Sequence, residues 1–225
     1  MNFKKYSFMK NKEIVTLTLL IFVSIFIRIP IFFIYGDTSL EYEWLSLVAN
    51  LINYNQLGWI NCEFSYSITR FCLEDNFLLP NLWMPPLYAY YLYFFTFFNL
   101  DEQNYIQLIL CSQIFLASLS VAVFYKINKF FFSNKLSLFS ALLFSFFPLN
   151  AYASSQISSI TLQIFLMILF FYFFFQLVEK KSLLFTILFS FTSGLLILIR
   201  GEFYAILIFT LIYLFFLKIK IKKIL

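Results

Sequence analysis

Residues 14–34 read IVTLTLLIFVSIFIRIPIFFI, an apolar run that carries a single charge, Arg28. A helix needs about 20 apolar residues to cross the hydrocarbon core of a bilayer, and this run has that length. The lysines before it resemble the basic start of a signal peptide, but a signal peptide has an apolar core of only about 7–15 residues. The run therefore predicts a retained membrane helix near the N-terminus.

Five later runs have the same apolar character, and we expect each to form a membrane helix: Tyr105–Tyr125, Leu136–Tyr152, Ile157–Val178, Leu183–Ile199 and Gly201–Leu217. The last is short, but neighbouring lysines can extend to the headgroups while the bilayer thins. Only 12% of the residues are charged, whereas soluble domains carry about 25%. The sequence predicts an all-α, polytopic membrane bundle of about six transmembrane helices, with residues 1–225 as a single domain.

The lysines give this bundle an orientation. All thirteen fall in four short clusters at the ends of apolar runs, and none lies between Glu13 and Tyr125. Loops rich in lysine stay on the cytoplasmic side of a membrane. We therefore expect an integral plasma (inner) membrane protein with both termini in the cytoplasm and residues 36–104 outside as one outer loop. Because the positive charge is confined to the membrane-flanking clusters, membrane lipid and not nucleic acid is the expected partner.

Two helices are expected in the outer loop. Residues Pro86–Leu100 are apolar but too short to span, so we expect a juxtamembrane or re-entrant helix. The second is an amphipathic helix lying on the membrane. Thr38 and Glu41 fit a capping box at its start, and the segment from Asn55 to Asn81 is expected to be irregular. Its apolar face would consist of Leu40, Trp44, Leu47, Val48, Leu51 and Ile52.

Asp37 and Glu41 are the first candidates for chemistry. Asp37 follows the first apolar run, and four residues of spacing would bring Glu41 to the same side of a helical turn. A carboxylate there could take a proton from an acceptor hydroxyl or amine. The alternative is that both residues only cap a helix.

Two arginines are candidates for binding an anion. Arg28 lies inside a span, where a charge is costly and marks a functional site by default; the alternatives are extension to the headgroups or pairing with Asp37. Arg200 lies in the hairpin Arg200–Glu202 between the last two spans, and its planar guanidinium suits a lipid phosphate. The alternative for Arg200 is a plain interfacial anchor.

The cysteines and the absence of histidine limit which disulfide and which metal sites can be expected. Cys62 and Cys72 both fall in the outer loop, where an oxidising environment favours a disulfide. The chain has no histidine, so His-ligated metals and His-based acid–base catalysis are excluded. We expect no metal site.

Four segments together resemble a known family. They are Gly36-Asp37 with Glu41-Tyr42, Met84-Pro85-Pro86-Leu87-Tyr88, Phe147-Pro148-Leu149 with Tyr152 and Ser154-Ser155-Gln156, and Gly194-Leu195-Leu196 running to Arg200-Gly201-Glu202. Their order is similar to the N-terminal half of the polyprenyl-phosphate-sugar-dependent glycosyltransferases of the GT-C fold. The protein-mannosyltransferase and aminoarabinose-transferase branch is the most similar.

The resemblance implies roles for these residues. Asp37 would be the catalytic base with Glu41 beside it, and Tyr42, Pro86 and Tyr88 would line the substrate-binding face. Substrate binding would also involve the hairpin residues Arg200 and Glu202, although Gly201 stands where the family has proline. Arg28 is a further substrate-binding candidate because of its charge inside a span and not because of the resemblance. The donor would be a lipid-linked (polyprenyl-phosphate) sugar, with no certain cofactor. Family members are roughly twice this length, so the expected alternatives are a fragment, a split gene with a separate C-terminal half, and an inactive remnant.

The sequence thus favours transfer of a sugar from a polyprenyl phosphate to an extracytoplasmic acceptor. Two other readings stay open: a non-catalytic membrane subunit, and a transporter or flippase-like protein for lipid-linked glycans. Transporters usually show internal repeats and interrupted or charged mid-membrane helices. Here we find only Arg28 and no repeat.

The lysine map makes a testable prediction about topology. Single cysteines placed at Ser133 or Asn134 in a cysteine-free background should be labelled only from the cytoplasm, and a cysteine at Ser65 only from outside. An impermeant maleimide applied to intact cells and to opened cells measures both. Outside labelling at Ser133 would contradict the six-span arrangement.

Overall fold

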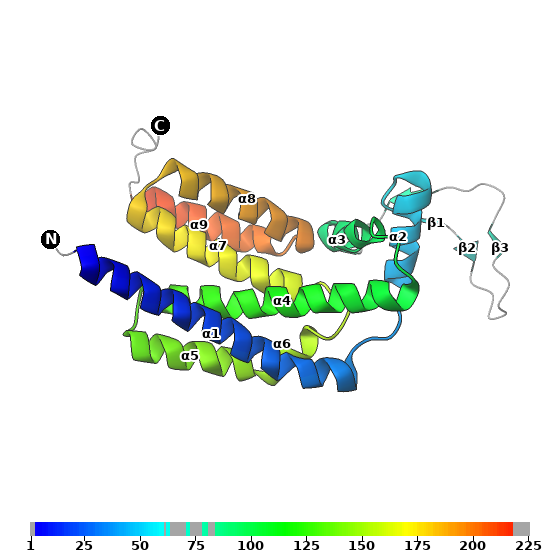
Figure 1. The fold of residues 1–225 in the computed structure, drawn as a ribbon. Helices are drawn as coiled ribbons and strands as arrows, with labels where there is room; N and C mark the ends of the chain where they lie inside the picture. The colour runs from blue at the N-terminus through cyan, green and yellow to red at the C-terminus, as the bar shows by residue number, and fades with distance from the viewer. Residues whose placement is uncertain (1–2, 61, 64–70, 73–77, 81–83, 218–225) are drawn as a thin grey trace. The chain divides into compact units, whose positions relative to one another are not determined.

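The computed structural model describes residues 3–60, 62–63, 71–72, 78–80 and 84–217 (Figure 1). The chain divides into two compact units, which we call unit 1 (Met1–Asp37 and Leu110–Leu225) and unit 2 (Thr38–Ile109). Helices dominate both, so the helical membrane bundle expected from the apolar runs is confirmed.

Unit 1 contains the long apolar helices. Three helices in the described residues are long and apolar enough to span a membrane, and α8 and α9 are shorter apolar helices. The α4 helix starts in unit 2 and continues into unit 1. The helices are α1 (Phe3–Tyr35, with Lys12–Tyr35 as the apolar span), α4 (Glu102–Asn128), α5 (Asn134–Phe146), α6 (Pro148–Ala153), α7 (Ile160–Lys180), α8 (Leu183–Ile199) and α9 (Phe203–Phe216).

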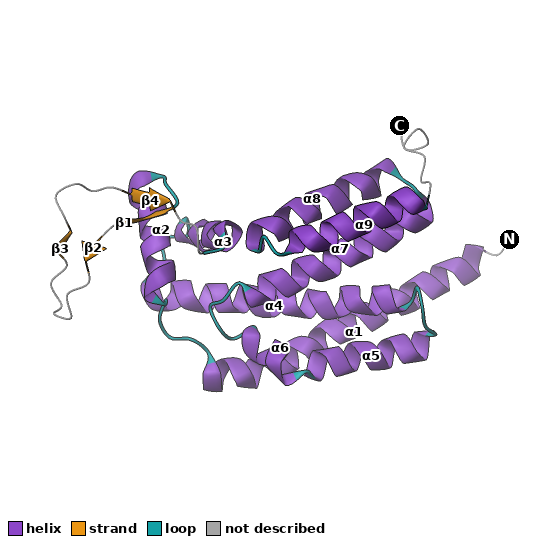
Figure 2. Ribbon diagram, turned by 180° about the vertical axis from the view of Figure 1, so that it is seen from behind, coloured by secondary structure: helices purple, strands orange, loops and turns teal. Residues whose placement is uncertain are grey.

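The helix α4 packs between two groups of helices. On one side, Leu20 of α1 shares a buried cluster with Val121 and Tyr125 of α4 and Ala141 of α5. On the other side, the Lys126 ammonium of α4 lies 5.9 Å from the centroid of the Tyr172 ring of α7. Figures 1 and 2 show α7, α8 and α9 side by side. The core of unit 1 therefore forms around α4.

The prediction that the third expected span forms one continuous helix is wrong. Residues 136–152 do not form one helix, because α5 ends at Phe146 and α6 begins at Pro148. Phe147 has an extended backbone (ψ 115°), as steric contact with a following proline favours. Proline lacks a backbone N–H, which is tolerated at the first position of a new helix. The break turns the chain into α6 and the loop that leads to α7.

Unit 2 combines two helices with four short strands, coloured orange in Figure 2. The helices are α2 (Tyr42–Tyr54) and α3 (Pro86–Thr96). Strand β1 (Gly58–Ile60) pairs antiparallel with β4 (Leu78–Pro80), and β2 (Cys62–Glu63) pairs antiparallel with β3 (Phe71–Cys72). The segment expected to be irregular thus contains strand pairing in its described residues.

The apolar face of α2 is confirmed in part. Four of the expected residues are buried, namely Trp44, Leu47, Val48 and Leu51. However, Leu40 precedes the helix, and Ile52 is 54% exposed. Asn50, which is not part of the expected apolar face, is also buried and donates a 2.6 Å hydrogen bond to the Gly58 carbonyl. This face packs within unit 2, and the expected contact of the helix with the membrane stays a prediction.

The expected capping box at the start of α2 is also wrong. The helix begins at Tyr42, and Glu41 is its N-cap, with an extended backbone and no side-chain capping bond. A capping box joins the N-cap to the third helical residue. Thr38 stands too far before this helix to serve as its cap.

Helix α3 begins at Pro86, as expected, but it ends before the expected last residue, Leu100. Pro86 occupies its first turn and the helix ends at Thr96. Its 11 residues span about 16 Å at 1.5 Å per residue, well short of the roughly 30 Å hydrocarbon core. The Tyr105 hydroxyl of α4 donates a 2.9 Å hydrogen bond to the Leu92 carbonyl and joins the two helices.

The strand register makes the expected disulfide testable. Cys62 and Cys72 are direct partners in the β2–β3 pair. Directly opposed residues have Cα atoms about 4.5–5.5 Å apart, within the range of about 4.4–6.8 Å that a disulfide requires. We expect mass spectrometry of unreduced peptides to recover the two cysteines as one cross-linked pair. Exposed Cys111 of α4 is unpaired and is the matched control, because it should be alkylated without reduction. Alkylation of all three would contradict the disulfide.

Candidate functional site

Asp37 is fixed at the end of α1 by contacts with the loop between α6 and α7. Its backbone N–H donates a 3.1 Å hydrogen bond to the Ser155 carbonyl. Its carboxylate oxygen Oδ2 accepts a 2.6 Å hydrogen bond from the Ile157 backbone N–H. The carboxylate is therefore held in one orientation by a segment that lies 120 residues away in the sequence.

Two further contacts secure the same junction. The Gln156 side-chain amide donates a 2.6 Å hydrogen bond to the Tyr35 carbonyl at the last residue of α1. The rings of Tyr35 and Tyr152 pack edge to face with centroids 6.3 Å apart. The motifs Gly36-Asp37 and Ser154-Ser155-Gln156, which the sequence offered only as separate segments, are thus one structural site.

This arrangement leaves the Asp37 carboxylate able to accept a proton. The side chain is half-buried, and a carboxylate has a second oxygen with acceptor capacity of its own. The expectation that Asp37 and Glu41 share a side of one helical turn is wrong, because neither residue is helical. Sequence reasoning also missed the roles of Ser155 and Ile157, which act through their backbones and so leave no side-chain signal.

Arg28 neither extends to the headgroups nor pairs with Asp37. Its side chain is fully buried and turns back along α1, where Nη1 donates to the Ser24 carbonyl at 3.1 Å and to the Ser24 hydroxyl at 2.5 Å. Its Nε and Nη2 have no hydrogen-bond partner among the described residues. Arg28 lies about 10 Å before Tyr35, the last residue of α1, at 1.5 Å per residue.

The hairpin Arg200–Glu202 lies at the same end of unit 1 as Asp37. Helix α7 starts beside the loop that binds Asp37 and ends in a left-handed residue, Lys181. Helix α8 packs against α7 and returns, so Arg200 comes back to the starting end. Arg200 and Glu202 are both exposed. A Cβ at Gly201 would meet no atom within 4 Å, so the hairpin has room for a side chain at this position.

The remaining expected site residues belong to unit 2. Glu41 and Tyr42 are exposed at the start of α2, and Pro86 occupies the first turn of α3. Tyr88 is completely buried, with its ring edge to face on Trp44 (centroids 4.7 Å) and stacked on Tyr91 (5.5 Å). In this structure Tyr88 positions α3 against α2, and its contact with a substrate stays a prediction.

No group of three or more Cys, Asp or Glu side chains that could hold a metal ion occurs in the described residues. Among the expected site residues, this end of unit 1 carries the Asp37 carboxylate at the end of α1 and the Arg200 guanidinium at the α8–α9 hairpin. These groups suit proton transfer and phosphate binding.

Comparison with known proteins gives one match. The model of the family described as dolichyl-phosphate-mannose-protein mannosyltransferase matches residues 84–225, more than half of the chain. The match covers α3, the hairpin Arg200–Glu202 and the loop that binds Asp37, whereas Asp37 itself precedes it. No curated protein and no solved structure matches.

Gly36 allows the chain to turn from α1 to Asp37, which makes it a test of the site. A Cβ at Gly36 would lie 2.4 Å from the Phe32 carbonyl oxygen, a backbone atom. We expect Gly36→Ala to destabilise the junction by about 1–3 kcal/mol, the usual cost of overpacking. Gly201→Ala is the control, since its Cβ meets nothing within 4 Å. Thermal melting in detergent should show a lower midpoint for Gly36→Ala only, and equal midpoints would refute the steric argument.

Proposed function

Because the chain belongs to the dolichyl-phosphate-mannose-protein mannosyltransferase family, we propose that it transfers a sugar from a polyprenyl phosphate to an acceptor at the membrane surface where α1 ends. The family consists of membrane glycosyltransferases that use lipid-linked sugar donors. We place the reaction on the extracytoplasmic side, since the lysine clusters flank the opposite end of the apolar helices. The family description favours mannose as the sugar.

One observation carries the assignment to this end of unit 1. The Asp37 carboxylate is held by the Ile157 N–H at 2.6 Å, and the exposed Arg200 hairpin lies at the same end. A general base must be oriented before the reaction, because misplacement lowers the rate steeply. Fixing the carboxylate through backbone atoms supplies this orientation.

The reaction is a displacement at the anomeric carbon of the donor sugar. The acceptor oxygen or nitrogen forms a bond to that carbon while its proton passes to Asp37. The bond between the anomeric carbon and the phosphate oxygen breaks, and the polyprenyl phosphate leaves with the electron pair. Cationic groups that stabilise the leaving phosphate lower the barrier of such a step.

Two arginines are available for this phosphate. Arg200 is exposed at the hairpin, where a headgroup can reach it, and its planar fork matches phosphate oxygens. We therefore assign the leaving phosphate to Arg200, with Glu202 beside it to orient the sugar or the arginine. Arg28 is a second candidate, because a buried charge with unpartnered N–H groups is costly unless it meets an acceptor.

We propose a role in binding the sugar acceptor for the expected site residues of unit 2. Glu41 and Tyr42 are exposed at the start of α2 and offer a carboxylate and a hydroxyl. Pro86 and Tyr88 would shape the surface around them through the packing of α3. In this proposal Asp37 is the catalytic base and Glu41 contributes less.

A carrier of lipid-linked glycans is the second candidate function. The buried Arg28 and the interruption at Phe147–Pro148 are features that transporters also show. A transfer assay and a flipping assay on the same proteoliposomes separate the two functions. Movement of the lipid without sugar transfer would favour the carrier.

Asp37→Asn tests the assignment of the base. Asparagine keeps an oxygen that can accept from the Ile157 N–H, so the junction should survive while the base is lost. We expect sugar transfer in proteoliposomes with a polyprenyl-phosphate-mannose donor to fall by at least about 100-fold, the lower range for losing general-base catalysis. Donor retention on the purified protein should be unchanged.

Two matched variants separate catalysis from structure. Asp37→Ala removes the carboxylate and the contact with Ile157, so it should lower the melting midpoint, whereas Asp37→Asn should not. Arg200→Gln should weaken donor retention and leave the midpoint unchanged. If Asp37→Asn transfers sugar at nearly the rate of the parent protein, Asp37 is not the catalytic base. Asp37 would then act only as a structural link through its contacts with the α6–α7 loop.

A further inference from the structure

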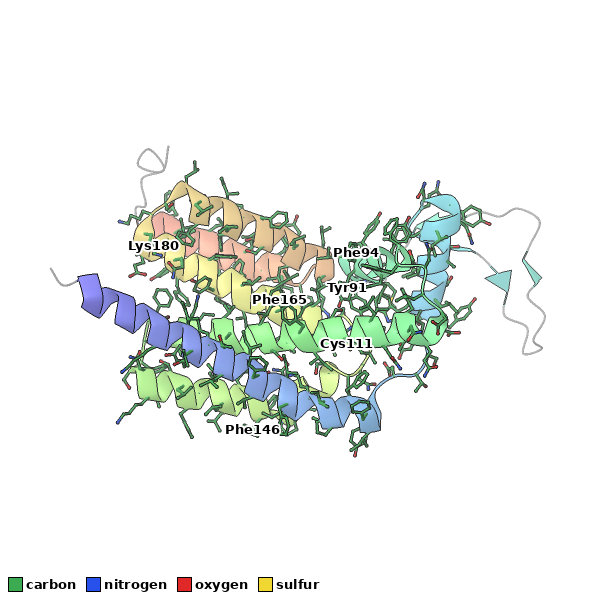
Figure 3. The ribbon with its side chains drawn as sticks, in the orientation of Figure 1. Tyr91, Phe94, Cys111, Phe146, Phe165 and Lys180 are labelled. Carbon is green, nitrogen blue, oxygen red and sulfur yellow. The ribbon has the colours of Figure 1, made fainter. Side chains whose placement is uncertain are left out.

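A second polar site lies at the lysine-rich end of unit 1, away from Asp37. A cavity of about 370 Å³ opens there between α1, α4 and α7, within the usual size range of roughly 300–1,000 Å³ for small-molecule sites. Its wall includes Glu13, Lys126, Lys129, Tyr172, Gln176 and Glu179. In Figure 3 Lys180, the residue after Glu179, marks this end of α7.

The charges in the cavity wall balance. Glu13 and Lys129 form an ion pair with a nitrogen–oxygen distance of 3.1 Å. Lys126 lies over the Tyr172 ring, and neither Lys126 nor Glu179 has an ion-pair partner among the described residues. With two lysines and two glutamates the wall is neutral overall, but it presents one unpaired cation and one unpaired anion.

Gln176 adds an unsatisfied acceptor to this wall. Its side chain is only 8% exposed, and its carbonyl oxygen Oε1 is buried without a hydrogen-bond partner. Burying such an oxygen unpaired costs about 1–3 kcal/mol. The cavity therefore offers an acceptor and a carboxylate to a ligand that donates hydrogen bonds, together with an ammonium for an anionic group.

We propose that this cavity binds the headgroup of a zwitterionic phospholipid that carries a phosphate and a primary ammonium. The phosphate meets Lys126, and the ammonium donates to Gln176 Oε1 and Glu179. The position suits a lipid, because the cavity lies at the lysine-bearing ends of the candidate spans in α1, α4 and α7, where we expect the headgroups. The site is independent of the transfer reaction: Glu13 and Asp37 lie about 36 Å apart along α1, at 1.5 Å per residue.

The wall favours this headgroup over two common alternatives. Phosphatidylglycerol has a net negative charge, and the unpaired Glu179 would oppose it. Phosphatidylcholine is zwitterionic, but its methylated ammonium has no N–H to donate to Gln176. Phosphatidylethanolamine supplies both the phosphate and the donor.

The experiment is native mass spectrometry of the full chain in detergent, titrated with these three lipids. We expect phosphatidylethanolamine to bind at least about tenfold more tightly, as one charge-assisted hydrogen bond of about 1.5 kcal/mol requires. Free phosphoethanolamine is added as a competitor in a further titration. It should displace phosphatidylethanolamine only if the headgroup alone provides the binding affinity. Equal affinity for all three lipids would overturn the proposal.

Single-residue variants test which side chains contact the lipid headgroup. Glu179→Gln and Gln176→Met should each weaken phosphatidylethanolamine binding by about tenfold and leave phosphatidylglycerol binding unchanged or stronger. Lys126→Gln should weaken the binding of every lipid. Lys135→Gln, an exposed lysine outside the cavity wall, is the matched control and should have no effect. If it weakens binding as much as Lys126→Gln, the lysines act only as a basic surface and the site does not exist. Glu179 is exposed, so its variant tests the ammonium contact even if Gln176→Met fails to fold.

Discussion

Polar groups inside a bilayer have no water to bind, and this constraint shapes unit 1. Hydroxyl groups within the helices donate back to the carbonyl four residues earlier, as Ser118 does to Ile114 and Thr192 to Leu188. Arg28 follows the same rule and turns back to Ser24. Small polar side chains satisfied in this way let helices approach closely. Ser118 of α4 is an example, since it is fully buried in unit 1 and satisfied by this bond.

The helical frame has one break that matters for function. At Phe147–Pro148 the chain leaves α5 and enters α6, and the following loop reaches the end of α1. Pro148 therefore affects Asp37 indirectly, because the break before this proline leads into α6 and the loop whose backbone holds the Asp37 carboxylate.

The sites proposed at the two ends of unit 1 would serve different chemistry. At one end the α6–α7 loop fixes the Asp37 carboxylate, and the Arg200 hairpin lies at the same end; in the proposed reaction these groups would move a proton and stabilise a phosphate. At the other end charges of both signs are balanced around a buried amide oxygen, an arrangement suited to binding without reaction. The distance between the ends is set by the length of the spanning helices, and so by the bilayer itself.

The sequence by itself determined the membrane class, most helices and the family resemblance, because apolar length and lysine position are local properties. It located Asp37 and the Arg200 hairpin as candidates, and it found the buried face of α2 at Trp44, Leu47, Val48 and Leu51. Only the tertiary structure decided what holds Asp37, since Ser155 and Ile157 act through backbone atoms that carry no sequence signal. Tertiary packing also decided the direction of Arg28, the burial of Asn50 and Tyr88, and the meeting of Glu13, Lys126 and Gln176 in one cavity. Each of these depends on which helices become neighbours, and residue spacing along one helix does not contain that information.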